Sequence, residues 1–338
     1  MIGAKVDLAG CTVLLAAAPG SATRAARYLQ AQCVDTLLQA STPLGALALL
    51  GQSDVLALCT GQSLKFSALR RQALAQGTPV IELDPGTAEG RITLVGGGPG
   101  ALELLTLRAA AVLASADVVF CDRLGPGEFL DQLAPQARII DVGKQPGHHK
   151  VTQERIEELM LREASRGNHV VRLKGGDPYV FGRGFEEVES ATAAGIPVSV
   201  VPGLSSCITV PAAAGIPVTA RGVTRAFTVI SGHDPLEEQQ LAQLALLGGT
   251  IVVLMGMGTL EHTAAGLRRR GLPADTPCAV VESGTTGTQR TTHATLSTLA
   301  AAARAAGCAN PAVIVIGQVA ALPLGLDAAQ QMSLEATA

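Results

Sequence analysis

Apolar and polar positions alternate along this chain as the strands and helices of an α/β protein do. Short aliphatic runs predict buried strands, and longer segments with apolar residues every three or four positions predict helices between them. In the first part of the chain, strands are predicted at 13–18, 54–59 and 79–83 and helices at 21–32 and 64–76. A turn at 84–87 closes this part. Residues 1–88 are therefore expected to form a small Rossmann-like α/β domain.

The same alternation continues from residue 91 to residue 317. Strands are predicted at 91–95, 118–121, 138–142, 169–173, 198–201, 226–231, 250–254, 278–282 and 312–317. Helices are predicted at 102–114, 153–166, 185–194, 205–214, 236–246, 259–270 and 295–306. This order predicts an α/β fold for residues 89–325, and the polar residues 326–338 are expected to be a flexible tail.

Composition and charge exclude several classes of protein. With 16% charged residues and a net charge of −3, nothing points to nucleic acid or an anionic membrane as a partner. Residues 190–220 carry no charge, but their four prolines exclude a membrane-spanning helix. The seven cysteines form no CxxC pair, so reduced thiols and a cytoplasmic location are expected. The apolar run at 13–18 fits an opening strand better than a signal peptide.

The first glycine-rich turn follows the predicted strand 91–95 and reads GGGPGA. Gly96, Gly98 and Ala101 match the loosest dinucleotide-binding pattern. Pro99 argues against that reading, because it removes a backbone donor where a pyrophosphate would need one. A tight βα turn accounts for the motif equally well, and so does a loop on which an uncharged adenosyl group could lie.

Charged residues follow two predicted strands. Asp122 and Arg123 come directly after the strand 118–121, and Lys144 lies just past the strand 138–142. Ligands bind at the carboxyl ends of strands in open α/β sheets, although a solvated ion pair would also fit this stretch. The tandem His148 and His149 lack a third ligand at suitable spacing, so no metal site is predicted.

The most specific stretch is residues 170–184, which reads VVRLKGGDPYVFGRG. Arg172 and Lys174 lie on a β-rich run, where charge is costly unless it is paired or faces a cleft. The two glycines allow a ligand to approach the backbone, and Asp177 offers an acceptor for ribose hydroxyls or a partner for a cation. A purely structural turn would not need this combination, so we place a ligand site here.

Three further elements leave their alternatives open. Ser205 and Ser206 could cap a helix or contact a ligand. Met255 could be a core residue or line an adenosyl pocket. The turn at 16–21 reads AAAPGS and lacks G-x-G-x-x-G, which disfavours nucleotide binding by residues 1–88. A nicotinamide-dependent oxidoreductase acting through this first domain is therefore the weaker alternative from another functional class.

Taken in order and spacing, these motifs resemble the uroporphyrinogen III C-methyltransferases of the tetrapyrrole methylase family. The matching pieces include LVGGGPGALELLTLRA, VGKQPGHHKVTQERI, VVRLKGGDPYVFGRGFEEVE and TIVVLMGM, and all of them together cover about two-thirds of the chain. The resemblance implies two α/β subdomains, 89–202 and 203–325, with S-adenosylmethionine in the cleft between them, in a homodimer. Residues 1–88 weakly resemble a shortened, degenerate dehydrogenase half of the sirohaem synthases.

The resemblance also implies roles for individual residues. It nominates Asp122 as proton acceptor and Lys144 as proton donor. It places the following residues at the cofactor: Pro99, Gly175, Gly176, Asp177, Val180, Ser205, Ser206, Met255 and Gly284. From loop position and charge, we expect these residues to bind the substrate's carboxylates: Arg123, Lys150, Arg172, Lys174, Arg183 and Arg221.

The implied reaction is methylation of uroporphyrinogen III at C2 and C7 to give precorrin-2, in sirohaem or cobalamin biosynthesis (EC 2.1.1.107), with S-adenosylhomocysteine as by-product. A related precorrin methylase or a diphthine-type methylase is the alternative. Three departures from the family pattern concern substrate fit: Phe185 replaces a glycine, Ala220 replaces a histidine, and Ser205-Ser206 replaces a threonine and a small neighbour.

Overall fold

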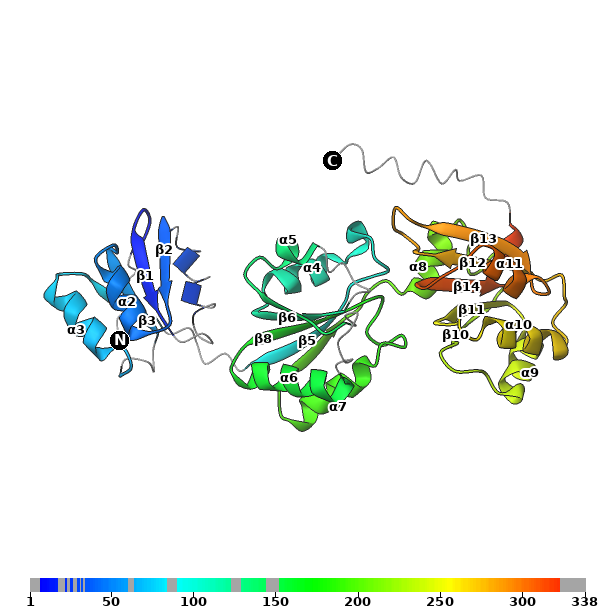
Figure 1. The fold of residues 1–338 in the computed structure, drawn as a ribbon, viewed down its shortest axis with the longest axis horizontal. Helices are drawn as coiled ribbons and strands as arrows, with labels where there is room; N and C mark the ends of the chain where they lie inside the picture. The colour runs from blue at the N-terminus through cyan, green and yellow to red at the C-terminus, as the bar shows by residue number, and fades with distance from the viewer. Residues whose placement is uncertain are drawn as a thin grey trace.

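Three β-sheets follow one another along the chain, each with its own helices (Figure 1). The computed structural model describes residues 7–17, 34–59, 64–83, 90–122, 129–143 and 152–322, together with single positions between 22 and 32. The order of strands is β2-β1-β3-β4 in the first sheet, β7-β6-β8-β5-β9 in the second and β10-β11-β14-β12-β13 in the third. The predicted α/β class is confirmed.

The first sheet is small and parallel. Its elements are β1 (Thr12–Ala16), β2 (Thr36–Ala40), α2 (Pro43–Leu50), β3 (Val55–Cys59), α3 (Ser67–Ala75) and β4 (Val80–Leu83). The predicted strands correspond to β1, β3 and β4, whereas β2 and α2 were not predicted. Half of the residues of the helix predicted at 21–32, and all of the turn at 84–87, lie outside the described residues.

The second sheet is parallel and covered by helices on both faces. Its strands are β5 (Arg91–Gly96), β6 (Val118–Cys121), β7 (Arg138–Asp141), β8 (His169–Lys174) and β9 (Val198–Val201). The helices are η1 (Leu102–Leu104), α4 (Leu107–Ala114), α5 (Leu130–Leu133), α6 (Gln153–Ser165) and α7 (Gly184–Ala193). Successive strand residues point to opposite faces, so Val95 packs under α4 while Leu94 packs under α6.

The third sheet is mixed. Its strands are β10 (Phe227–Ser231), β11 (Thr250–Leu254), β12 (Pro277–Glu282), β13 (Arg290–Thr295) and β14 (Ala312–Ile316). Its helices are α8 (Ser206–Ala213), α9 (Glu238–Leu247), α10 (Leu260–Arg269), α11 (Leu299–Ala305) and η3 (Gln318–Ala321). β14 runs antiparallel between β11 and β12. β11 and β12 therefore point the same way, and their carboxyl ends lie at one edge.

The apolar cores follow the three sheets. Each buried cluster draws its residues from one sheet and its helices. Val180 is the exception within the described residues, because it follows β8 of the second sheet but packs against the core of the third. In this part of the chain, no helix has the length and apolarity that a bilayer crossing requires.

Candidate active site

The predicted catalytic and cofactor-binding residues that the structure describes follow strands at their carboxyl ends. Pro99, Asp122 and the segment 175–177 come after β5, β6 and β8, which are neighbours in the second sheet. Ser205 and Ser206 come after β9 of the same sheet. Met255 and Gly284 come after β11 and β12 of the third sheet. The parallel order of β6, β8, β5 and β9 thus places four loops along one edge.

Three of these strand ends touch through glycine. A Cβ added to Gly203 would lie 2.2 Å from the carbonyl oxygen of Gly176, and one added to Gly96 would lie 2.4 Å from the amide nitrogen of Gly203. Gly98 and Gly176 also exchange backbone hydrogen bonds, at N···O distances of 3.2 and 2.6 Å. We call Gly96, Gly98, Gly176 and Gly203 the glycine contact. It brings the ends of β5, β8 and β9 together without side chains between them.

Asp177 ties two of these loops together. Its Oδ1 accepts a hydrogen bond from the amide of Tyr179 at 2.8 Å, and its Oδ2 accepts one from the amide of Gly203 at 3.0 Å. A carboxylate oxygen has two lone pairs, so these bonds leave capacity for ribose hydroxyls. The role predicted for Asp177 at the cofactor remains a prediction, and its role in fixing the loop is an addition to it.

Residues with positive φ gather in the same loops. Among the described residues, the non-glycine ones are Phe181 (φ 54°) and Arg183 (58°) after β8, Met255 (56°) after β11, and Ser283 (44°) and Thr285 (70°) after β12. Such backbone costs of order 1–3 kcal/mol per residue and is concentrated at functional sites. Met255 is also 45% exposed, so it is not the core residue that sequence analysis left open.

The loops of the second and third sheets meet. The amide of Ala101 donates to Oγ1 of Thr285 at 3.4 Å. The amide of Thr285 donates to the side chain of Gln289, which in turn donates to the carbonyl of Ala213 at the end of α8. Gly284 is buried against Val210, where an added Cβ would lie 2.4 Å from a methyl carbon. Residues after β5 and β12, far apart in sequence, thus lie side by side.

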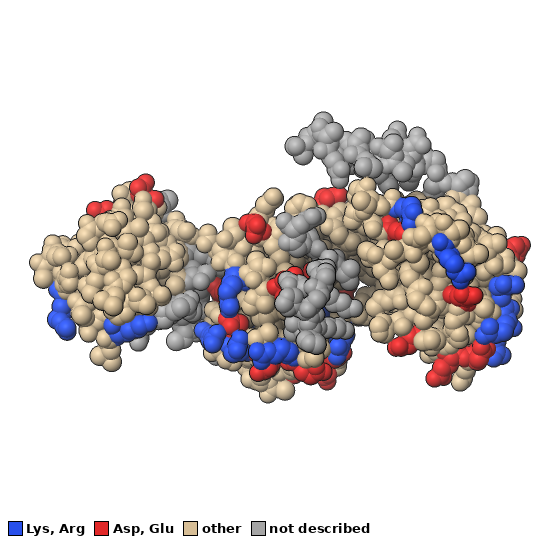
Figure 2. Space-filling model, in the orientation of Figure 1, with Lys and Arg blue, Asp and Glu red and all other residues tan. Residues whose placement is uncertain are grey.

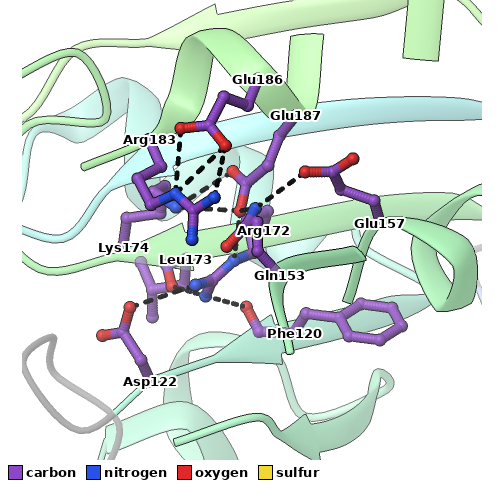
Figure 3. Close-up of polar contacts among 10 residues, drawn as sticks. All are labelled: Phe120, Asp122, Gln153, Glu157, Arg172, Leu173, Lys174, Arg183, Glu186 and Glu187. Carbon is purple, nitrogen blue, oxygen red and sulfur yellow. Dashed lines mark hydrogen bonds and ion pairs between the residues drawn. The ribbon is translucent and has the colours of Figure 1, made fainter. Parts of the chain in front are cut away.

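A buried charged cluster stands beside Asp122 (Figure 3). Nη2 of Arg172 lies 3.2 Å from Oδ2 of Asp122, and its Nε lies 3.2 Å from Oε1 of Glu187. Nζ of Lys174 donates to both carboxylate oxygens of Glu187, at 2.9 and 3.0 Å. Arg172 is 4% exposed and Glu187 only 1%, whereas the side chain of Asp122 is 27% exposed. Asp122 is therefore the member of this cluster that remains partly open.

The surroundings shift two pKa values near this cluster. Burial lowers the pKa of Lys174, and the neighbouring Arg172 cation adds to this effect, while Glu187 opposes it. Burial raises the pKa of the Cys121 thiol to about 11, with further contributions from the carboxylates of Asp141 and Asp122. Cys121 is therefore a neutral thiol near pH 7 and is not a nucleophile.

The predicted substrate-binding residues fall into three groups. Arg172 and Lys174 are buried and ion-paired, so their charge is already balanced inside the protein. Arg183 and Arg221 are exposed, and Arg183 pairs with Glu186 at 2.9 and 3.1 Å. Arg123 and Lys150 lie outside the described residues, as do Lys144, the predicted proton donor, and the two tandem histidines. On the face that Figure 2 shows, basic side chains lie beside acidic ones.

Sequence reasoning missed Glu187, Thr285 and Gln289. A signal for Glu187 existed, because two cations on an otherwise apolar strand need a buried counter-charge. The choice between the adjacent Glu186 and Glu187 depends on the orientation of α7, which buries only Glu187. Thr285 and Gln289 carried no such signal.

The chain matches one protein family and several solved structures. The sequence model of the family "Tetrapyrrole (Corrin/Porphyrin) Methylases" matches residues 91–300. The structure of uroporphyrin-III C-methyl transferase from Thermus thermophilus, complexed with S-adenyl homocysteine, aligns with a TM-score of 0.57 and 42% identity over 68% of this chain and 98% of that one. Cobalt precorrin-4 methyltransferase aligns with a TM-score of 0.63 and 26% identity over 71% of this chain and 100% of that one.

Curated relatives agree with this match. The S-adenosyl-L-methionine-dependent uroporphyrinogen III methyltransferase of Methanosarcina barkeri is 47% identical over 68% of this chain and 92% of its own length. The chloroplastic enzyme of the same name from Arabidopsis thaliana is 46% identical over 76% of this chain and 70% of its own length. Siroheme synthase 2 of Klebsiella pneumoniae is 40% identical, but only 55% of its length is covered. The chain belongs to the tetrapyrrole methylase family, among the uroporphyrinogen-III C-methyltransferases.

Proposed function

We propose that this chain transfers methyl groups from S-adenosylmethionine to C2 and C7 of uroporphyrinogen III, giving precorrin-2 for sirohaem or cobalamin biosynthesis. The observation that carries the proposal is the order of strand ends in the second sheet. There the partly exposed Asp122 neighbours the glycine-lined ends of β8, β5 and β9. Two relatives are named for S-adenosylmethionine-dependent methylation of uroporphyrinogen III.

The site suits an adenosyl donor. Backbone groups at half-exposed glycines offer hydrogen bonds to an uncharged nucleoside without placing side chains in its way. The residues proposed to hold it are Pro99, Gly175, Gly176, Asp177, Val180, Ser205, Ser206, Met255 and Gly284. Gly284 has no side chain and would act through its backbone, which lies against Val210 of α8. When bound, the donor supplies an electrophilic methyl group on a sulfonium centre.

Asp122 is proposed to act as the proton acceptor. After a pyrrole carbon has been methylated, the ring must lose or redistribute a proton, and a positioned carboxylate can take it. Arg172 donates a hydrogen bond to Oδ2 of Asp122 and so holds the carboxylate in place. Lys144 remains the proposed proton donor.

The substrate carries eight carboxylates, which call for basic partners. Arg183 and Arg221 are exposed and suit this role. Arg123 and Lys150 are proposed for it from their position next to Asp122 and Lys144 in sequence. For Arg172 and Lys174, burial favours a role inside the protein over direct contact with the substrate.

We also propose a homodimer in the cytoplasm. Exposed apolar side chains on the loops after β8 and β9 and on α7 and α8 give a second copy a surface to cover, and they include Phe181, Phe185, Leu204 and Ile208. Cys11, Cys121, Cys207, Cys278 and Cys308 are free thiols in the described part of the chain, which suits a reducing compartment. Light scattering should give twice the chain mass of 34.4 kDa.

The test of this function is direct. The purified protein is incubated with S-adenosylmethionine and uroporphyrinogen III, and mass spectrometry should find a product carrying two added methyl groups. Asp122→Asn should lower kcat by about 10²-fold or more while calorimetry still detects S-adenosylhomocysteine. Full turnover by this variant would exclude the proton-acceptor role.

A later precorrin is the second candidate substrate. The alignment with cobalt precorrin-4 methyltransferase supports it, because that TM-score is the higher of the two. Offering both macrocycles at equal concentration and comparing kcat/KM decides between them. The turn on which nicotinamide binding by residues 1–88 depends lies mostly outside the described residues, so that alternative is best tested by titrating NAD into the full chain.

A further inference from the structure

Glu187 is the centre of the buried charged cluster. It lies on α7 and accepts hydrogen bonds from Nε of Arg172 at 3.2 Å, from Nζ of Lys174 at 2.9 and 3.0 Å, and from Nε2 of Gln153 at 3.0 Å (Figure 3). These donors come from β8 and α6, so Glu187 is enclosed from both sides. A buried carboxylate with this many donors is fixed in position.

The charges of the cluster balance only when Asp122 is counted. Arg172 and Lys174 carry two positive charges, and Glu187 supplies one negative charge in the same buried space. An unpaired buried charge is costly, so the second positive charge requires another carboxylate. Asp122 supplies it, at 3.2 Å from Arg172. The other ionisable groups nearby are Asp141 and Cys121 beside Asp122, Glu157, which Gln153 also contacts, and the exposed Glu186, whose charge is paired with that of Arg183.

The guanidinium of Arg172 has little freedom to turn. Its Nη1 donates to the carbonyl of Leu173 at 2.8 Å and more weakly to that of Phe120 at 3.4 Å. Its Nε is held by Glu187. Because the guanidinium is planar and its donors form a rigid fork, fixing Nε and Nη1 also fixes the direction of Nη2. That direction leads to Oδ2 of Asp122.

We propose that Glu187 and Arg172 are positioning residues for Asp122 in methyl transfer. Glu187 holds Arg172, and Arg172 holds the carboxylate of Asp122 where it can take the proton that leaves the methylated carbon. This inference rests on the proton-acceptor role proposed for Asp122. Neither Glu187 nor Arg172 needs to touch the substrate.

A double-mutant cycle tests the proposal on the full chain. Arg172→Gln should lower kcat about tenfold or more, because a small displacement of a catalytic group greatly lowers the rate of the reaction. In the Asp122→Asn background the same change should alter kcat less than about twofold, because the group that Arg172 positions is gone. Glu187→Gln should behave in the same way.

The cycle needs a control for stability alone. Arg138 is at the amino end of β7, the end away from the candidate site, and its Nη2 lies 2.6 Å from Oε2 of the buried Glu163. Arg138→Gln should lower the unfolding temperature and leave kcat unchanged. Arg172→Lys keeps the positive charge but lacks the planar guanidinium. It should fold better than Arg172→Gln without recovering the wild-type kcat, so it replaces Arg172→Gln if that variant fails to fold. Calorimetric binding of S-adenosylhomocysteine should persist in every variant.

The possible outcomes are distinct. If Arg172→Gln lowers kcat by the same factor in both backgrounds, the two residues act independently and the positioning role is wrong. If folded Glu187→Gln turns over at the wild-type rate, Glu187 is only structural. If Asp122→Asn itself keeps full turnover, the proton-acceptor role fails, and the positioning role fails with it.

Discussion

At Gly203 the chain has room for a hydrogen atom and for nothing larger. A Cβ there would lie 2.2 Å from the carbonyl oxygen of Gly176 and 2.7 Å from the carbonyl carbon of Gly96. Backbone cannot move aside as a flexible side chain can. Gly203→Ala should therefore lower the free energy of unfolding by about 3 kcal/mol and abolish binding of S-adenosylhomocysteine. Urea denaturation and calorimetry measure the two effects.

Gly258 is the matched control for this change. It lies in the loop after β11, no atom would come within 4 Å of an added Cβ, and its φ is not in the left-handed region. Gly258→Ala should change the free energy of unfolding by less than about 0.5 kcal/mol. Equal stability of the two variants would mean that the strand ends are not in direct contact.

Residue identity predicted the strand-end positions of the candidate site residues, but not the contacts between their side chains. The glycines and Asp177 could be placed at strand ends because a strand, a turn and a polar residue follow one another in sequence. The pairing of Arg172 with Glu187 could not be predicted, because it depends on how α7 packs on β8. Arg172 and Lys174 were accordingly predicted to face substrate, whereas the structure buries both.

Three parts of the chain have secondary structure that the hydrophobic pattern did not predict. The helix predicted at 102–114 is two elements, η1 and α4, because Thr106 begins a new helix and its side chain accepts a hydrogen bond from the amide of Ala109 at 3.1 Å. β13 was not predicted, since its residues RTTHAT contain no apolar run. α2 was not predicted because it is apolar on all sides and shows no helical period.

The cap of α4 gives a prediction at this scale. Thr106→Ala removes the acceptor for the amide of Ala109 and should lower the free energy of unfolding by about 1 kcal/mol. Thr106→Ser keeps an acceptor and should cost much less. Urea denaturation of both variants checks this, and equal losses would show that the hydroxyl does not stabilise the helix.

The β12–β13 hairpin gives a prediction for acid. The Arg290 guanidinium, bonded to both oxygens of Glu282 at 2.8 Å, lowers the pKa of that carboxyl from its ordinary value of 4.5 to about 2. A carboxyl with a lowered pKa in the folded state stabilises the fold above its ordinary pKa and loses that contribution as the pH falls towards the lower value. Stability should therefore decrease between pH 4.5 and 2.

Glu282→Gln isolates this contribution. The variant should be less stable than the wild type at about pH 6, and the difference should shrink as the pH falls to about 3. Urea denaturation at each pH measures it. A difference that stays constant with pH would show that the ion pair does not account for the acid sensitivity of the hairpin.

At the scale of the whole molecule, the three sheets have separate cores. No apolar cluster among the described residues joins the first sheet to the other two. The family match likewise begins at residue 91. A chain beginning at residue 89 should therefore lose the calorimetric transition of the first sheet, keep the unfolding of the other two sheets unchanged, and still bind S-adenosylhomocysteine. A lower unfolding temperature of the shortened chain would show that the other two sheets depend on the first for stability.

The glycine contact also determines how this enzyme can be redesigned. Where the three strand ends meet at glycines, only backbone N–H and C=O groups are available to a ligand. A point substitution does not change those groups. To make the protein accept a bulkier sulfonium donor, a side chain outside the glycine contact has to be shortened. The exposed Met255, proposed to lie at the cofactor, is the first choice. Selectivity can be changed there while the glycine contact stays intact.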